Sequence, residues 1–178
     1  MINQPEITIY GEGQVSLSVL NKEDLKNTIN VVPSSVHAFP LNIENEIILT
    51  LNHRGIDLIG GHIEKGETPE QALIRECMEE ACLIPLKYEL IGAIQVDNSK
   101  NPSALKKGYP TTGYQFFYKI THFELENFKQ THESHGIVNL ALEEAQAKHH
   151  NWLKSYTLLF EMSLLNDLNL KQRNSLVP

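Results

Sequence analysis

The sequence has little cysteine, no excess of positive charge and no long apolar run, and each absence narrows what the chain can be. Only two of its 178 residues are cysteines, Cys77 and Cys82. They stand five apart in one predicted helix and face different ways, so we expect no disulfide between them. The formal net charge of -7 argues against broad binding to nucleic acid, which requires a basic surface.

No run of about 18 apolar residues occurs, so we expect no membrane span. The opening residues MINQPEITIY lack the basic and apolar regions of a secretory signal, which makes a cytoplasmic protein the expectation. With 41% apolar and 21% charged residues, the composition is that of an ordinary globular protein. The length fits a single domain spanning residues 1–178.

The pattern of apolar residues predicts more strands than helices. Alternating segments at 6–10 and 14–20 flank the turn GEG and predict an N-terminal hairpin, part of an extension at 1–30 that also holds a short helix at 22–29. Further strands are predicted at 35–39, 46–51, 55–61, 88–96 and 113–123, a polar loop at 97–112, and helices at 142–149 and 152–168, within 142–168. This order indicates an α/β fold with a mixed β-sheet.

One helix has a well-defined start. Thr68 is a good N-cap, Pro69 occupies the first helical position and Gln71 the third, which together form a capping box. We expect Pro85 to end this helix.

Negative charge is crowded near the end of that helix. At about 100° per residue, Glu76, Glu79 and Glu80 share one arc, where like charges destabilise an isolated helix. A solvated helix face is the simpler interpretation of such a run. The glycines and glutamates just before the helix favour a second interpretation of the charge run, in which the carboxylates hold a divalent cation. Carboxylates without a cluster of Cys or His suit Mg²⁺, with Mn²⁺ as a substitute.

The stretch from Gly61 to Leu83, GHIEKGETPEQALIRECMEEACL, resembles the Nudix box, G-x5-E-x7-R-E-U-x-E-E-x-G-U with U a bulky apolar residue. The matching positions are Gly61, Glu67, Arg75, Glu76, Cys77, Glu79, Glu80 and Leu83. The resemblance implies a Nudix-type α/β/α sandwich. It also implies metal-dependent hydrolysis of a pyrophosphate bond in a nucleoside diphosphate linked to another group, X.

The resemblance assigns roles to residues of the box. Glu76, Glu79 and Glu80 would bind metal, with the Gly60 carbonyl as a further ligand, and Glu79 is one candidate for the base that activates water. Arg75 and Glu67 would orient the loop and helix through a salt bridge. Many family members use one more carboxylate from outside the box. Glu133 is the first candidate for it, followed by Glu124 and Glu126.

Two positions depart from the family pattern. Ile59 stands where proline is common before the glycine pair, which we expect to affect only loop stiffness. Cys82 stands where a left-handed glycine often ends the helix, at a cost of about 1 kcal/mol if that conformation is kept. Alternatively, the helix runs on to Ile84.

The sequence says less about substrate and partners. Lys100, Lys106 and Lys107 are candidates for phosphate contacts, Tyr109 for stacking on a base, and Phe116 for the floor of a base pocket. A flexible solvated loop is the simpler interpretation of the lysines. The histidines form no ligand pattern, and we expect His132, His135, His149 and His150 at the surface.

A small-molecule nucleotide, with an oxidised deoxynucleoside triphosphate as first choice, is the expected substrate, and neither nucleic acid nor membrane is an expected partner. A homodimer stays open. The competing hypotheses are a non-catalytic nucleotide-sensing module of the same fold and an acidic interaction domain with a chance motif. The three intact carboxylates favour the enzyme.

Overall fold

The computed structural model describes residues 4–11, 13–131 and 133–174, with only the backbone from residue 165 on. The strands are β1 (Glu6–Tyr10), β2 (Gly13–Asn21), β3 (Pro33–Pro40), β4 (Ile47–Asn52), β5 (Gly55–Asp57), β6 (Ile59–His62), β7 (Leu83–Asp97), β8 (Thr112–Leu125) and β9 (Gly136–Leu140). The helices are α1 (Lys22–Asn27), α2 (Pro69–Ala81), α3 (Pro102–Lys106), α4 (Leu142–Lys148) and α5 (Lys154–Asn174).

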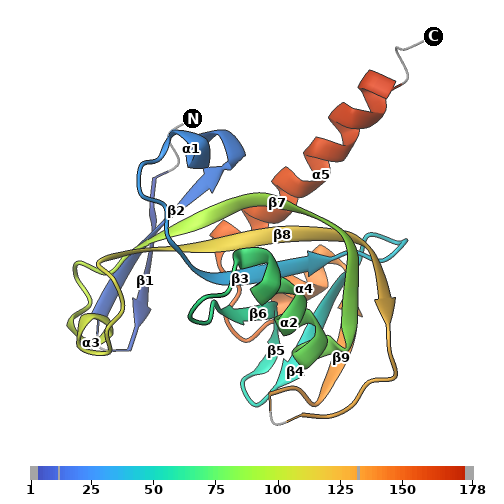
Figure 1. Ribbon diagram of the computed structural model, residues 1–178, viewed down its shortest axis with the longest axis horizontal. Helices are drawn as coiled ribbons and strands as arrows, with labels where there is room; N and C mark the ends of the chain where they lie inside the picture. Colours follow the sequence, from blue (N-terminus) through green and yellow to red (C-terminus); the bar gives the residue numbers. More distant parts are fainter. Residues whose placement is uncertain (1–3, 12, 132, 175–178) are drawn as a thin grey trace.

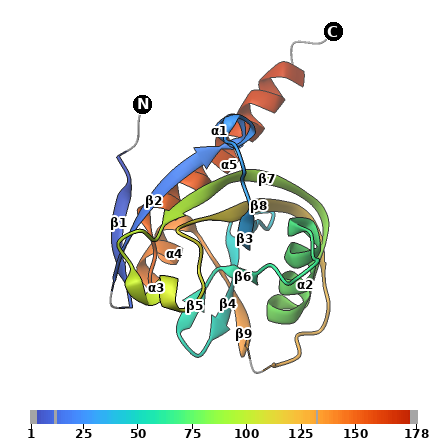
Figure 2. The ribbon, with the colours of Figure 1, turned by 60° about the vertical axis from the view of Figure 1, so that its left-hand side comes forward.

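Two sheets form the centre of the molecule. The larger has the strand order β1-β2-β7-β8-β3-β6, and the smaller β5-β4-β9. The larger sheet is mixed, because β3 runs parallel to β8 while its other pairs are antiparallel. Helix α2 lies on one side of the sheets, and α4 and α5 on the other (Figures 1 and 2). The predicted α/β class and mixed sheet are confirmed.

Side chains of β3 point alternately to the two sides of the sheet, so they pack into two separate core clusters. Val36 and Ala38 pack with Leu73 and Cys77 of α2. Phe39 packs on the opposite side, in a cluster that includes residues of α5. The sheet therefore presents α2 with one apolar face, and apolar packing holds the helix against the sheet.

The N-terminal hairpin is part of the larger sheet. Strand β2 pairs with β7 from Ser16 to Asn21, and β1 pairs with β2, so the predicted extension adds two strands at the sheet edge (Figure 1). Glu6 of β1 accepts hydrogen bonds from the backbone N–H groups of Lys154 and Ser155, both at 3.0 Å. These are unpaired donors of the first turn of α5, so the hairpin caps the C-terminal helix.

Replacing Glu6 with alanine is expected to lower the free energy of unfolding at pH 7 by about 1 kcal/mol, because the first turn of α5 loses its acceptor. Burial alone would raise the pKa of Glu6, but the hydrogen bonds from Ser155 and Lys154 outweigh it and lower the pKa. The contribution is therefore present above the usual pKa of 4.5 and is lost as the pH falls through the lower value of the folded protein. Urea unfolding at several pH values measures it. Equal stability of both proteins at pH 7 would contradict the cap.

Several predicted boundaries are wrong. The segment 55–61 is not one strand: β5 pairs with β4 in the smaller sheet, whereas β6 pairs with β3 in the larger, so the chain changes sheets near Leu58. Ile59, expected to act on loop stiffness, is a fully buried strand residue of the core. The loop 97–112 contains α3, and β9 was not predicted, because its short GIVNL sequence lacks clear alternation.

Helix α2 begins as predicted. The Thr68 hydroxyl accepts from the Gln71 N–H, and the Gln71 side chain accepts from the Thr68 N–H. Its end differs: the helix stops at Ala81, and Pro85 lies inside β7, opposite Phe123. Cys82 adopts the left-handed conformation (φ 50°), so the first of the two alternatives for this position is correct.

The thiol of Cys82 is buried and its Sγ accepts from the Lys129 N–H at 3.4 Å. Cys82→Ala and Cys82→Gly remove the same thiol, but only glycine relieves the left-handed strain. We therefore expect Cys82→Gly to be more stable than Cys82→Ala by about 1 kcal/mol in urea unfolding. The reverse order would show that the chain does not keep this conformation.

Within the described residues, no helix combines the length and the apolar character needed to cross a membrane.

Candidate functional site

Two of the three crowded carboxylates are buried against the glycine pair. Glu76 is 8% exposed and Glu80 is 7% exposed, and the Gly60 N–H donates to Glu80 Oε2 at 2.9 Å. A Cβ atom added to Gly61 would lie 2.3 Å from Glu76 Oε1. A Cβ on Gly60 (φ 149°) would lie 2.2 Å from the Val36 carbonyl oxygen. Only glycine lets β6 approach both the helix and β3 this closely.

Arg75 joins the loop before α2 to the helix. Its guanidinium binds Glu67 with two hydrogen bonds, Nε–Oε1 at 2.9 Å and Nη2–Oε2 at 3.0 Å. It also donates to Glu76 Oε1 at 2.8 Å and to the His62 carbonyl at 3.0 Å. The Arg75–Glu67 salt bridge is therefore present, and the hydrogen bond to Glu67 raises the pKa of Arg75 and lowers that of Glu67.

Glu79 stands apart from the other two glutamates. Its side chain is 46% exposed and lies 3.1 Å from Arg75 Nη1. The acidic arc is thus divided: Glu76 and Glu80 are turned toward the sheet, while Glu79 lies at the solvent edge.

Glu133 lies in the loop between β8 and β9. Although it is exposed, its charge acts on both Glu76 and Glu80 and raises the pKa of each. A role for Glu133 at the site of these two carboxylates stays a prediction. Glu124 and Glu126 are exposed as well, on and just after the end of β8.

The electrostatics of the buried pair fit a divalent cation. Burial raises the pKa of Glu80 to about 8, and the charges of Glu76, Asp57 and Glu133 add to that effect. Burial also raises the pKa of Glu76, although Arg75 opposes it. Buried carboxylates that repel one another bind a hard cation through oxygen ligands, as Mg²⁺ or Mn²⁺ requires. A role for the Gly60 carbonyl stays a prediction.

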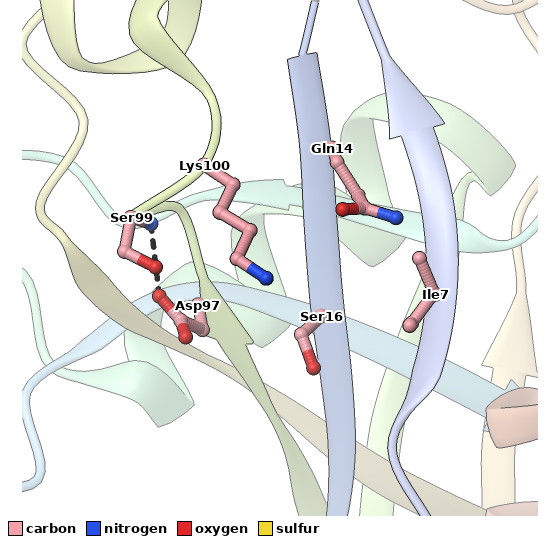
Figure 3. A pocket seen from close by; sticks show the side chains of 6 residues that line it. All are labelled: Ile7, Gln14, Ser16, Asp97, Ser99 and Lys100. Carbon is pink, nitrogen blue, oxygen red and sulfur yellow. Dashed lines mark hydrogen bonds between the residues drawn. The ribbon is translucent and has the colours of Figure 1, made fainter.

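The residues proposed to contact the substrate do not all lie together in the structure. Tyr109 lies beside the box, with its hydroxyl 3.5 Å from Nε2 of His62. Phe116 packs in the core cluster under α2, and Lys106 and Lys107 are exposed at the end of α3. Lys100 lines a hollow on the N-terminal hairpin with Asp97 and four other residues, none of them from the box (Figure 3).

A polar cluster formed by Asp57, His149 and His150 was not predicted. His149 Nε2 lies 3.0 Å from Asp57 Oδ1, and His150 Nδ1 lies 3.7 Å from Asp57 Oδ2. Burial alone would raise the pKa of Asp57, but contact with His149 and the charges of His150 and Arg54 lower it to about 2. The expectation of a surface position is thus wrong for His149, whose side chain is 1% exposed. His135 is exposed as expected, and His132 lies outside the described residues.

Asp57, His149 and His150 are close enough together to hold a metal ion. The hydrogen bonds argue for a different role. His149 Nδ1 accepts from the Asn151 N–H at 3.0 Å, which places the ring proton on Nε2, facing Asp57. The Arg54 guanidinium also lies 2.6 Å from the same carboxylate. A protonated Nε2 cannot ligate a metal. We therefore interpret the cluster as an ion pair of Arg54 with Asp57, beside a neutral His149 whose Nε2 is close to the carboxylate but does not meet hydrogen-bond geometry.

His37 of β3 lies near this cluster and stacks on Phe117, with ring centroids 5.0 Å apart. Both of its ring nitrogens are buried, and neither has a hydrogen-bond partner among the described residues. Burial lowers the pKa of His37 to about 4, so the ring is neutral at pH 7. In the sequence nothing links His37, Asp57 and His149, because they come from β3, β5 and the end of α4, which only the packed fold brings near one another.

Comparison with known proteins supports the resemblance of the box. The chain matches the NUDIX domain family over residues 32–160. It is 37% identical over 62 residues to the 8-oxo-dGTP diphosphatase of Escherichia coli (strain K12), a match over 32% of this chain and 48% of that protein. The alignment therefore spans about half the length of that relative.

Solved structures share the fold. A NUDIX hydrolase from Nitrosomonas europaea superimposes with a TM-score of 0.57 at 22% identity, covering 76% of this chain and 90% of that one. The MutT protein from Methanosarcina mazei Go1 superimposes with a TM-score of 0.56 at 16% identity, covering 78% of this chain and 99% of that one. At these identities the likeness concerns the fold alone.

Proposed function

Since the chain belongs to the NUDIX family, we propose that it hydrolyses a pyrophosphate bond in a nucleoside diphosphate linked to a further group, X, with a divalent cation held on α2. The observation that carries this proposal is the buried pair Glu76 and Glu80, packed against Gly60 and Gly61. A family member that had lost hydrolysis would not need to keep two mutually repelling carboxylates buried there.

Each residue of the box has a separate task in this proposal. Glu76 and Glu80 hold the cation, which Mg²⁺ is expected to supply, and the bound ion polarises phosphoryl oxygens and acidifies water. Arg75 fixes the Glu76 carboxylate and ties it to Glu67, so that loop and helix keep one geometry. Glu79 lies at the solvent edge, and we propose that either Glu79 or Glu133 accepts a proton from the attacking water.

A nucleoside triphosphate is the substrate class we propose, and an oxidised deoxynucleoside triphosphate is the first choice. The partial match to an 8-oxo-dGTP diphosphatase supports this choice. Tyr109 is proposed to stack on the base, because it lies beside His62, the second residue of the box.

The proposed function is tested by offering purified protein a panel of nucleotides with Mg²⁺ or Mn²⁺ and measuring the release of phosphate or pyrophosphate. The panel contains normal and oxidised deoxynucleoside triphosphates, nucleotide sugars, ADP-ribose and dinucleoside polyphosphates. We expect turnover of a triphosphate that requires the divalent ion. Binding of nucleotide without turnover of any compound would instead support the non-catalytic sensing module.

A further inference from the structure

Glu133, the carboxylate proposed to act from outside the box, lies next to a group of backbone hydrogen bonds to Thr131. The Thr131 hydroxyl accepts from the backbone N–H groups of Glu133 and Ser134, at 3.2 Å and 3.0 Å. The Thr131 N–H donates to the Ser134 carbonyl at 2.9 Å. These bonds hold Glu133 and Ser134 to Thr131, so the direction of the Glu133 side chain depends on where Ser134 is anchored.

Ser134 anchors this turn inside the protein. Its side chain is completely buried, and its Oγ lies 2.9 Å from Oγ1 of Thr50, which is also completely buried. The next residue, His135, donates its N–H to the Leu51 carbonyl at 2.7 Å, so the turn leads directly into the pairing of β9 with β4.

Thr50 also contacts the helix that carries the metal-binding residues. Its Oγ1 lies 3.3 Å from the backbone carbonyl oxygen of Glu80. That carbonyl belongs to the last turn of α2, where no intrahelical donor is available. One buried hydroxyl group therefore touches both the turn that carries Glu133 and the helical turn that carries Glu80.

We propose that Thr50 and Ser134 are positioning residues, whose hydroxyl pair holds Glu133 at the metal site in register with Glu80. The inference rests on the proposed function and extends it to residues that lie outside the box. A bridge of two short side chains, both buried, leaves little freedom for the turn to move relative to the helix. Neither side chain reaches the reacting atoms.

The test is a double-mutant cycle on the triphosphate of the panel with the highest turnover, with Mg²⁺ at saturation. Thr50→Val replaces the hydroxyl by a methyl group at nearly constant shape. We expect it to lower kcat by about 10- to 100-fold with little change in KM, as loss of groups that orient metal ligands does. Glu133→Gln should lower kcat by a similar factor. In the double variant, Thr50→Val should have no further effect, because Glu133 no longer acts.

Two controls separate positioning from general damage to the fold. Thr50→Ser keeps the hydroxyl and should retain kcat within about twofold, whereas a role in packing alone would make it worse than Thr50→Val. Thr8→Val makes the same chemical change on β1, far along the sheet, and should leave kcat unchanged.

Independent, multiplying effects of Thr50→Val and Glu133→Gln would overturn the inference, and so would full activity of either variant. If Glu80→Gln loses turnover while the Thr50 and Glu133 variants give one of these results, the inference fails and the proposed function stands. A wild type that cleaves no nucleotide would remove the function and the inference together.

Discussion

Replacing Glu80 with glutamine is expected to lower kcat for the preferred triphosphate by more than about 100-fold. Groups that merely orient a metal ligand cost about 10- to 100-fold when removed, so loss of a ligand should cost more. The exchange keeps size and hydrogen-bonding capacity: the amide still faces Gly60, whose N–H lies 2.9 Å from Glu80 Oε2. What it removes is the negative charge beside Glu76. Steady-state kinetics with Mg²⁺ varied at saturating nucleotide measures the effect.

The matched control is Glu143→Gln, the same exchange at an exposed position in the first turn of α4. It should retain the activity of the wild type. Undiminished turnover by Glu80→Gln would show that catalysis does not use this carboxylate, and the proposed metal site on α2 would have to be abandoned.

Mg²⁺ is expected to stabilise the wild type and not Glu80→Gln. At about 100 times its Kd, a ligand that binds only the folded state adds about 2.7 kcal/mol. For a chain of this size that is a rise in Tm of roughly 5–10 °C. Thermal unfolding with EDTA or with Mg²⁺ measures it without reference to any substrate. Equal shifts for wild type and variant would place the bound ion elsewhere.

The same experiment has an expected pH dependence. The pKa of Glu80 is about 8 in the folded protein, against a usual value of 4.5, so the folded state holds the proton more tightly than the unfolded state. With EDTA, the stability contributed by this group is therefore complete below about pH 4.5 and is lost as the pH rises toward 8, by at most about 1.4 kcal/mol per pH unit.

Glu80→Gln has no such proton to lose, so with EDTA it should be more stable than the wild type at pH 8 and closer to it at pH 5. Mg²⁺ should in turn stabilise the wild type more at pH 8 than at pH 5, because protons compete with the metal for the carboxylate. Parallel pH profiles for both proteins would contradict a buried Glu80 carboxylate.

Much of the site could be predicted from the sequence because its parts are close together along the chain. The capping residues Thr68 and Gln71 start α2 through contacts three residues apart, which a sequence reveals directly. The same holds for the glycine pair and for the Arg75–Glu67 bridge, whose members are only eight positions apart along the chain. Short-range contacts of this kind follow from the order of the residues, as does the family pattern that contains them.

Other features depended on pairing between distant strands. The break at Leu58 arises because β5 and β6 join different sheets, and no local pattern shows that. The hairpin at the N-terminus was predicted as an extension, yet it completes a sheet and caps α5 through Glu6. Asp57 and His149 come together across 92 positions of chain numbering (149 minus 57), so the burial of His149 could not be inferred from the sequence.

The sequence alone therefore determined which side chains this protein has for binding a cation and the order in which helix α2 presents them, because helical spacing and capping are short-range effects. Tertiary structure decided which of these carboxylates are buried, that Glu79 stands at the solvent edge, and that the Thr50–Ser134 pair lies against the last turn of α2. The physical reason is that burial, charge coupling and hydrogen bonds between distant strands depend on distances in space, which only the packed sheets and helices establish.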